Sequence, residues 1–331
     1  MKLRLLGLAV AGLFIGSSAS ALSFSSMTVF GDSLSDTGNV LVATGGAVPT
    51  APYFNGRFSN GPVWIDTLAT RLGLPSGGMS ALMGGGNYAF GGARTGAGAD
   101  PVPGLLAQAA GLWGPANPAA DAGGLYVLVG GGNDMRDARS AFQTGSAADA
   151  AGRQAAAEAA VESLATSLGF LASRGAQNVL IANLPDLGAT PEAAALGLVA
   201  ASSDASARYN ALMPGLLAFG SSLGLNMFFL DMAGLAQGIR NDALNNGGAV
   251  YGITNVFTPC GTFQGSIGIS CDVSLFSDAL HPSARSHEIL GLAAADLFLT
   301  AVPEPGTLAM FAVGLAMLGF AVSRRSAYAR R

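Results

Sequence analysis

Short apolar runs alternate along the chain with longer segments of helical periodicity. Unbroken apolar runs bounded by glycine, proline or polar residues are typical of strands buried on both faces of a sheet. Such strands are predicted at Met27–Phe30, Tyr88–Gly92, Leu125–Val129, Asn178–Leu184 and Asn226–Asp231. Strands that alternate with helices predict an α/β fold, in which right-handed crossovers place helices on both faces of a parallel sheet.

Apolar residues at helical spacing predict the helices between these strands. One helix should follow Gly61-Pro62, where Trp64, Ile65, Leu68 and Leu72 share a face. The others are expected at Leu105–Trp113, at Ser146–Arg174 with Ser146 as its N-cap, at Ala193–Leu223 with a break around Ala201–Asp204, and at Ser283–Thr300 with Ile289, Leu292, Leu297 and Phe298 on the apolar side.

Two segments have no clear periodicity. Val40–Asn60 is rich in glycine and proline, and Asn241–Leu280 is long and rich in glycine. Loops of this length in a compact domain are usually functional or cross-linked. We therefore expect both segments to lie at the mouth of a site.

The first residues have the pattern of a secretory signal. Lys2 and Arg4 precede an apolar core at Leu5–Ile15, and a run of small residues ends at Ala21. This order of basic, apolar and small residues predicts a signal peptide over residues 1–21, which is removed on export.

The C-terminal end has a second apolar segment. Gly306–Val322 contains 17 residues and is followed by four arginines, the last being Arg331. A buried core helix is the alternative, but the terminal position and the flanking arginines favour a membrane span with the arginines in the cytoplasm. The exported domain is therefore expected over residues 22–302 and the tail over residues 303–331.

The charge of the exported domain differs from that of the whole chain. Six of the 16 basic residues lie in the two terminal segments, and so does one of the 20 acidic residues. The domain keeps ten arginines and 19 acidic residues, a net charge near −9. An acidic domain without basic clusters argues against nucleic acid as a partner.

Cys260 and Cys271 are the two cysteines of the chain. In an exported protein, a disulfide is the natural interpretation. A metal site is disfavoured because no third ligand lies near the pair in sequence.

The pattern also suggests a nucleophile and its base. Ser33 lies directly after the first strand, at the edge of the sheet where open α/β folds bind ligands. A serine hydroxyl needs a base and an orienting acid. The chain has two histidines, and His281 lies three residues after Asp278, whereas His287 falls inside the last predicted helix. We therefore predict a triad of Ser33, His281 and Asp278.

Acyl transfer further needs hydrogen-bond donors aimed at the developing oxyanion. The N–H groups of Ser33 and Gly92 and the side-chain amide of Asn133 all follow predicted strands. We expect these three groups to form the oxyanion hole.

Four sequence blocks, in this order, resemble the GDSL or SGNH family of esterases and lipases. They are Gly31-Asp-Ser33-Leu, Asn87-Tyr-Ala-Phe-Gly-Gly92-Ala-Arg, Gly131-Gly-Asn133-Asp134 and Asp278-x-x-His281. The resemblance implies a three-layer α/β/α, flavodoxin-like sheet of order 2-1-3-4-5. It also implies that Ser33, His281 and Asp278 are catalytic, with Ser33, Gly92 and Asn133 around the oxyanion. Asp32, Asp36, Asn39 and Asp134 are expected to shape the loops.

Val302-Pro303-Glu-Pro305, the apolar span and the terminal arginines resemble a PEP-CTERM sorting signal. This resemblance implies a sorting protease as a partner. A plain C-terminal anchor is the alternative. Both interpretations place the domain in the periplasm, at the cell surface or outside the cell, with at least transient anchoring in the inner membrane.

These patterns together predict an exported serine hydrolase that cleaves carboxylic esters and needs no metal or organic cofactor. Its substrate is expected to be a lipid, a short-chain ester or an acetylated glycan. The alternatives are an O-acetyl esterase acting on an exported polysaccharide and a non-catalytic matrix-binding protein with the same fold. Phe54, Phe58 and Phe276 are candidates for an acyl pocket.

Overall fold

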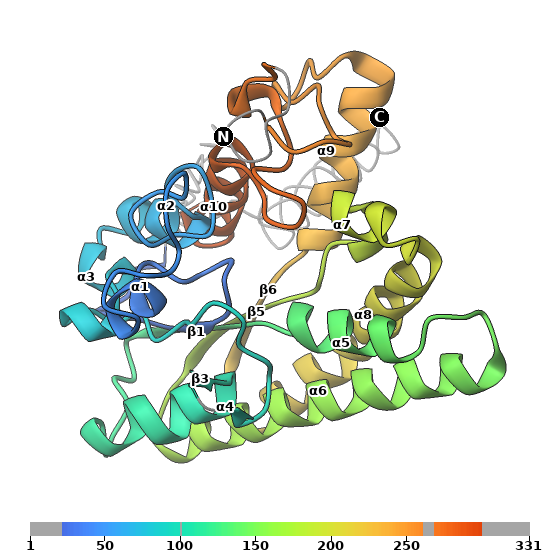
Figure 1. Cartoon of the computed structure of the whole chain (residues 1–331). Helices are drawn as coiled ribbons and strands as arrows, with labels where there is room; N and C mark the ends of the chain where they lie inside the picture. The colour runs from blue at the N-terminus through green and yellow to red at the C-terminus, as the bar shows by residue number, and fades with distance from the viewer. Residues whose placement is uncertain (1–21, 100, 261–267, 300–331) are drawn as a thin grey trace, which may run out of the picture. The chain divides into compact units, whose positions relative to one another are not determined.

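A parallel four-stranded sheet forms the centre of the structure (Figure 1). The structure is a computed structural model that describes residues 22–99, 101–260 and 268–299. The strands are β1 (Met27–Gly31), β4 (Leu125–Val129), β5 (Asn178–Ala182) and β6 (Asn226–Leu230), in the order β1-β4-β5-β6. Four of the five predicted strands are therefore confirmed. In the predicted numbering they have the order 1-3-4-5, which agrees with that part of 2-1-3-4-5.

The predicted second strand, Tyr88–Gly92, is wrong as a regular strand. Its backbone nevertheless runs beside the free edge of β1, where the Tyr88 N–H donates to the Val29 carbonyl at 2.8 Å and the Phe90 N–H donates to the Gly31 carbonyl at 3.1 Å. A single parallel bridge joins Val29 and Asn87. The segment turns away at Gly91 and Gly92 to reach the site, which limits the ladder to these contacts.

One face of the sheet packs on the largest apolar cluster. Phe30, Leu128 and Ile181 contribute from the strands. The helices over this face are α4 (Leu105–Ala107), a π-helical turn (Gln108–Trp113), α6 (Ala147–Ser173) and α8 (Val199–Ser222). Figure 1 shows α6 as a long helix across the bottom of the view, extending beyond the sheet. Because successive side chains alternate, the buried Val29, Val127 and Leu180 face the other side.

The opposite face is covered by α2 (Trp64–Arg71) and α10 (Ala284–Leu299). The two helices touch closely, since a Cβ on Gly291 would lie 2.5 Å from the Thr67 side chain. The expected apolar side of α10 needs one correction: Leu297 is 40% exposed, whereas Ala294 and Ala295 are fully buried. Small residues turn inward because α2 approaches too closely for leucine.

The remaining elements are short or connect the layers. They are α1 (Asn39–Ala43), α3 (Pro75–Gly78), the antiparallel pair β2 (Gly98–Ala99) and β3 (Val102–Pro103), α5 (Gly132–Ala141), α7 (Pro191–Ala195) and α9 (Met232–Asn246).

Two predictions about helices were wrong. The break expected around Ala201–Asp204 lies earlier, at Gly197, which has a φ of 68° between α7 and α8. Ser202 lies within α8, where its hydroxyl donates to the Leu198 carbonyl one turn back. The segment from Asn241 was also expected to be a loop, but α9 extends to Asn246.

The disulfide prediction is confirmed. Cys260 and Cys271 are bonded, with 4.9 Å between their Cα atoms. The bond ties the two ends of a segment that precedes Asp278 and His281 in the chain.

The chain divides into Ser23–Leu297 and a second unit made of its two ends. The predicted signal peptide (1–21) and membrane span (306–322) lie outside the described residues. Within residues 22–99, 101–260 and 268–299, no helix has the length and apolar character that a membrane crossing requires.

Candidate active site

The carboxyl ends of the strands bring the predicted residues together. Ser33 follows β1, and Asn133 lies in the first turn of α5, directly after β4. The turn into α5 requires glycine at position 131, where φ is 109° and a Cβ would lie 2.6 Å from the Tyr209 ring. This tight turn points the start of α5 at the same edge of the sheet as Ser33.

Ser33, His281 and Asp278 form a continuous hydrogen-bonded chain. The His281 Nε2 atom lies 2.9 Å from the Ser33 Oγ atom. The His281 Nδ1 atom lies 2.7 Å from the Asp278 Oδ2 atom. The structure therefore brings the three predicted residues together, although 248 positions separate Ser33 from His281.

Asp278 is held by the turn that it begins. Its Oδ1 atom accepts the N–H groups of Leu280 at 2.7 Å and His281 at 2.5 Å. Its Oδ2 atom also accepts the Tyr53 hydroxyl at 2.6 Å. Burial opposes ionisation of this carboxyl, but the bonds to His281 and Tyr53 outweigh it and lower the pKa of Asp278 to about 2. The carboxylate facing His281 is therefore ionised at neutral pH.

Val40–Asn60 does reach the site, but Phe54 and Phe58 do not form the expected acyl pocket. The Phe58 ring packs on the His281 ring with 5.6 Å between centroids. Phe54 is 39% exposed. Of the three aromatic candidates, Phe276 alone lines the cleft that contains Ser33. Phe58 supports the imidazole instead.

The oxyanion candidates are arranged around Ser33. Gly92 has a φ of 84°, a conformation that favours glycine, and its neighbour Ala93 accepts the Asn133 Nδ2 amide at 2.9 Å. This leaves the second N–H of that amide for another acceptor. Among the described residues, the backbone N–H groups of Ser33 and Gly92 have no acceptor.

The motif residues expected to shape loops make such contacts. Asp36 accepts the N–H groups of Gly38 and Gly91, at 2.8 and 2.9 Å. Asn39 donates to the Asn87 and Ala89 carbonyls, both at 2.8 Å. The Asp36 and Asn39 side chains thereby attach the loop after β1 to the segment that carries Gly92.

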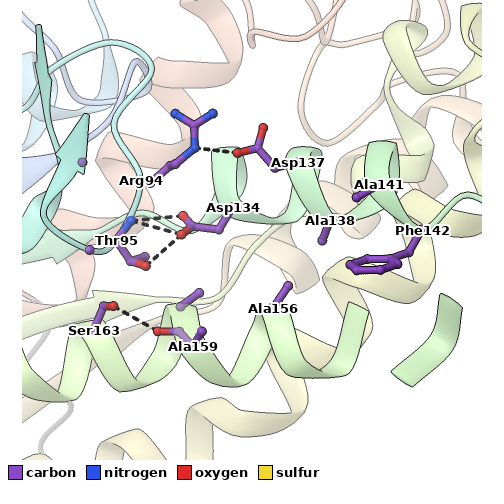
Figure 2. Close-up of a pocket in the computed structure, with 13 residues that line it drawn as sticks. Arg94, Thr95, Asp134, Asp137, Ala138, Ala141, Phe142, Ala156, Ala159 and Ser163 are labelled. Carbon is purple, nitrogen blue, oxygen red and sulfur yellow. Dashed lines mark hydrogen bonds and ion pairs between the residues drawn. The ribbon is translucent and has the colours of Figure 1, made fainter. Parts of the chain in front are cut away.

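Asp134 binds the other end of that segment. It accepts the Thr95 hydroxyl at 2.9 Å and the Thr95 N–H at 3.1 Å, as Figure 2 shows. An open hollow of about 630 Å³ lies beside this contact, and five alanines of α5 and α6 form part of its wall. Asp134 thus acts in the architecture of the loop.

A second layer of charge orients Asn133. The Arg136 Nη1 atom donates to the Asn133 Oδ1 atom at 3.2 Å. Glu192 holds Arg136 through two contacts, at 2.5 and 3.0 Å, and also pairs with the buried Arg139. The Glu192 N–H donates to the Ala279 carbonyl, within the Asp278–His281 turn.

Sequence reasoning missed Tyr53, Arg136 and Glu192. Tyr53 and Glu192 lie far in sequence from Asp278 and Ala279, which they contact. One weak signal existed for Arg136, which lies three residues after Asn133 and hence on the same helical face.

A cleft of about 660 Å³ opens from Ser33, within the size range of small-molecule sites. Ser33, Asn133 and His281 are among the residues that line it. The walls are mostly apolar. They come from the loops after β1 and β5, from one face each of α5, α8 and α9, and from the segment around Phe276 and His281. The cleft therefore suits a substrate with a substantial apolar part.

Asp32 is a buried carboxyl beside Ser33. Burial raises the pKa of Asp32 to about 6, although its bond from the Leu34 N–H and the nearby charge of His281 counteract the effect. The folded protein therefore holds this proton more tightly than the unfolded chain, whose carboxyl has a pKa of 3.8. The contribution to stability is complete below about pH 4 and is lost as the pH rises through about 6.

We expect Asp32→Asn to remove this loss of stability. Relative to the unsubstituted protein, the variant should gain up to about 3 kcal/mol in unfolding free energy between about pH 4 and about pH 8, since each pH unit between the two pKa values corresponds to about 1.4 kcal/mol. Urea unfolding at both pH values measures the difference. The exposed Asp272→Asn serves as the control, and an equal effect of Asp32→Asn at both pH values would contradict this account.

The second histidine is not suited to be the base. His287 is fully buried on α10, where its Nδ1 atom accepts the Trp64 N–H at 3.3 Å. Burial and the charge of His281 lower the pKa of His287 to about 3. Within the part of the chain that the structure describes, no group of three or more His, Cys, Asp or Glu residues could hold a metal ion.

Two protein families match this sequence. A model described as GDSL-like Lipase/Acylhydrolase matches residues 27–294. A PEP-CTERM protein-sorting motif matches residues 301–325, which implies an exported protein sorted to the cell surface.

Individual proteins are also similar. Phosphatidylcholine-sterol acyltransferase of Aeromonas hydrophila is 29% identical over 319 residues, which cover 90% of this chain and 84% of that protein. Lipase 1 of Photorhabdus luminescens is 31% identical over 180 residues, which cover 54% of this chain and 25% of that protein. The crystal structure of LAE5, an alpha/beta hydrolase enzyme from the metagenome of Lake Arreo, Spain, has a TM-score of 0.39 at 13% identity and covers 86% of this chain and 96% of that one.

The family model spans the sheet, the loops at its carboxyl edge and the turn that carries His281. The chain therefore belongs to the GDSL-like lipase/acylhydrolase family, and it carries a PEP-CTERM sorting motif at its C-terminal end.

Proposed function

We propose that this protein is an exported serine hydrolase that cleaves carboxylic esters through Ser33, His281 and Asp278. The observation that carries the proposal is the unbroken chain of hydrogen bonds from the Ser33 hydroxyl through His281 to Asp278. Membership of an acylhydrolase family supports ester bonds as the target.

The mechanism follows from the order of these contacts. The Ser33 Oγ atom attacks the ester carbonyl carbon while its proton passes to the His281 Nε2 atom. Asp278 keeps the Nδ1 proton in place and stabilises the imidazolium. The tetrahedral intermediate collapses when His281 returns the proton to the leaving alcohol, which leaves an acyl group on Ser33. Water, deprotonated by His281, then attacks this acyl-enzyme and releases the acid.

The oxyanion of both intermediates is assigned to three donors, the N–H groups of Ser33 and Gly92 and the second N–H of Asn133 Nδ2. Their lack of other acceptors among the described residues supports this role. Because they are fixed before substrate binds, no donor has to reorganise as charge develops.

Covalent labelling tests the proposal directly. A fluorophosphonate probe should modify Ser33 in the full-length protein, with the labelled residue identified by mass spectrometry. Pretreatment with the probe should abolish hydrolysis of nitrophenyl esters. A protein that leaves the probe unreacted at Ser33 would be a binding protein with the same fold.

Acyl transfer to an alcohol is a second candidate activity, favoured by the Aeromonas hydrophila acyltransferase that is similar over 90% of this chain. The acyl-enzyme would then react with an alcohol instead of water. Formation of a new ester when glycerol or a sterol is added identifies this activity. Release of acetate from an acetylated glycan would instead identify the polysaccharide esterase.

The terminal segments complete the proposal. Residues 1–21 would direct export, and the segment 306–322 would hold the protein in the inner membrane until a sorting protease cuts near the Pro303-Glu-Pro305 sequence. Mass spectrometry of the protein recovered from the cell surface would give both mature ends.

We expect Arg136 to act through Asn133. Asn133→Ala should lower kcat by about 10²–10³, the effect of losing one oxyanion donor. Arg136→Gln should lower kcat by about tenfold with little change in KM, because the Asn133 amide loses the bond that orients it. In the Asn133→Ala background, Arg136→Gln should have almost no further effect.

Arg94→Gln is the control. Arg94 also pairs with a residue of α5, the exposed Asp137, but its guanidinium makes no hydrogen bond to Asn133. Arg136→Lys should restore part of the activity. Independent losses that multiply in the double variant would show that Arg136 acts by some route other than Asn133.

A further inference from the structure

One wall of the cleft is a single face of α9. The residues that line it follow helical spacing: Ala233, Ala236, Gln237, Arg240, Asn241 and Leu244. The Ala233 N–H donates to Asn183, which follows β5, so the helix begins at the carboxyl edge of the sheet. α9 then rises away from that edge (Figure 1). At 1.5 Å per residue, Arg240 lies about 10 Å farther along the helix axis than Ala233.

The charged groups of the cleft differ in how far they are neutralised. Arg136 is paired with Glu192 through two contacts. Asp186 caps a short turn by accepting the Gly188 N–H at 2.8 Å. Arg240, in contrast, has no carboxylate partner within residues 22–99, 101–260 and 268–299.

Backbone contacts hold the Arg240 side chain in place. The Nη1 atom donates to the Val256 carbonyl at 2.9 Å and more weakly to the Ala189 carbonyl at 3.4 Å. The guanidinium carbon lies 5.4 Å from the centroid of the Phe257 ring. Among the described residues, the Nε and Nη2 atoms have no acceptor. The guanidinium is therefore fixed in position and retains donors for a ligand, which lowers the entropic cost of binding an anion.

The helix that carries Arg240 packs against the segment that leads to His281. Ile239, the neighbour of Arg240, packs with Leu275 and Phe276 in one apolar cluster. Phe276 in turn forms an isolated antiparallel β-bridge with Pro282, the residue directly after His281. Because His281 returns its proton to the leaving alcohol, the alcohol portion of an ester lies next to this segment.

We propose that Arg240 forms an anion subsite that binds a phosphate or carboxylate on the alcohol portion of the ester substrate. This inference rests on the proposed esterase function and specifies its substrate class. The acidic charge of the domain as a whole would repel such substrates, so the selection has to come from this local cation.

The test compares butyrate esters that differ only in the alcohol: glycerol, glycerol 3-phosphate and glycerate. For the full-length protein in detergent, we measure kcat/KM for each ester and take the ratio of anionic to neutral. Arg240→Gln should lower this ratio about tenfold, the effect of one charge-assisted hydrogen bond, and Arg240→Lys should lower it less. The phosphate and carboxylate esters show which anion is preferred.

Arg71→Gln is the matched control, since it removes one exposed arginine at the end of α2 and should leave the ratio unchanged. An equal loss on all three esters would give Arg240 a structural role and overturn the subsite. So would a dependence on Arg240 that appears only when the anion is in the acyl portion, as in the glycerol ester of succinate.

A binding measurement keeps the subsite separate from catalysis. Calorimetry should detect glycerol 3-phosphate, but not glycerol, binding to the full-length protein, and Arg240→Gln should weaken that binding about tenfold. If Ser33 reacts with no probe and no ester is cleaved, the proposed function fails, while this measurement still decides the subsite. Equal binding by the variant and the unsubstituted protein would overturn it.

Discussion

Ser33→Ala is expected to lower kcat for ester hydrolysis by about 10⁴–10⁶, because removing the proposed nucleophile leaves only substrate binding and the proposed oxyanion donors. KM should change little. The Ser33 side chain is small and its hydroxyl contacts His281. Initial rates on short-chain and long-chain nitrophenyl esters measure the loss, and unchanged thermal unfolding shows that the fold is intact.

Ser35→Ala provides a matched control. Ser35 is two residues away and fully buried, and its hydroxyl accepts the Trp64 indole N–H at 3.1 Å, so its role is structural. This variant should lose stability and keep its turnover per folded molecule. Equal turnover by Ser33→Ala and the unsubstituted protein would end the esterase proposal.

Asp278→Asn is expected to lower kcat by about 10³–10⁴, although the side chain keeps its shape. The ionised Asp278 accepts the His281 Nδ1 proton, which leaves Nε2 free to take the Ser33 proton. The amide of asparagine can donate to Nδ1 and favour the tautomer with its proton on Nε2. His281 would then face Ser33 with a proton already in place and could not act as the base.

The tautomer explanation predicts a pattern that simple damage would not. Asp278→Asn and Asp278→Ala should be similarly slow, and KM should change little in either. Asp272→Asn, an exposed carboxylate six positions earlier, should retain full activity. A rise in KM with an unchanged kcat would show that Asp278 acts in substrate binding only.

Tyr53 adds a structural condition to this second prediction. Its hydroxyl donates to the same Asp278 oxygen that faces His281, and burial together with that bond raises the pKa of Tyr53 above its ordinary value. The phenol therefore stays protonated and remains a donor over the whole working range of pH. Val40–Asn60, which has little regular structure, thus contributes directly to the candidate triad.

The sequence by itself determined the residues whose meaning is local. Apolar runs identified four strands because both faces of a parallel sheet are buried. Ser33 and Asn133 could be placed at one edge of the sheet because each directly follows a strand. His281 could be chosen over His287 because the one lies in a turn after Asp278 and the other in a helix.

Local pattern was misleading where tertiary contacts decide the outcome. Tyr88–Gly92 has the composition of a strand, but the chain leaves β1 there to carry Gly92 to the site. Gly234 and Gly238 obscured α9, which is stabilised by Asp231 as its N-cap, with an Oδ1 to Gly234 N–H distance of 2.9 Å, and by packing of its apolar face. The serines near Ala201 suggest a break, although within a helix their hydroxyls can bond one turn back.

The contacts between distant residues were decided by the tertiary structure alone. The bond from Tyr53 to Asp278 spans 225 positions and that from Arg136 to Glu192 spans 56. No periodicity encodes such pairs, because each depends on where whole elements pack and not on the residues nearby. The sequence thus determined the strands and the candidate reactive groups. Folding determined what holds those groups in place and which cation of the cleft has no carboxylate partner among the described residues.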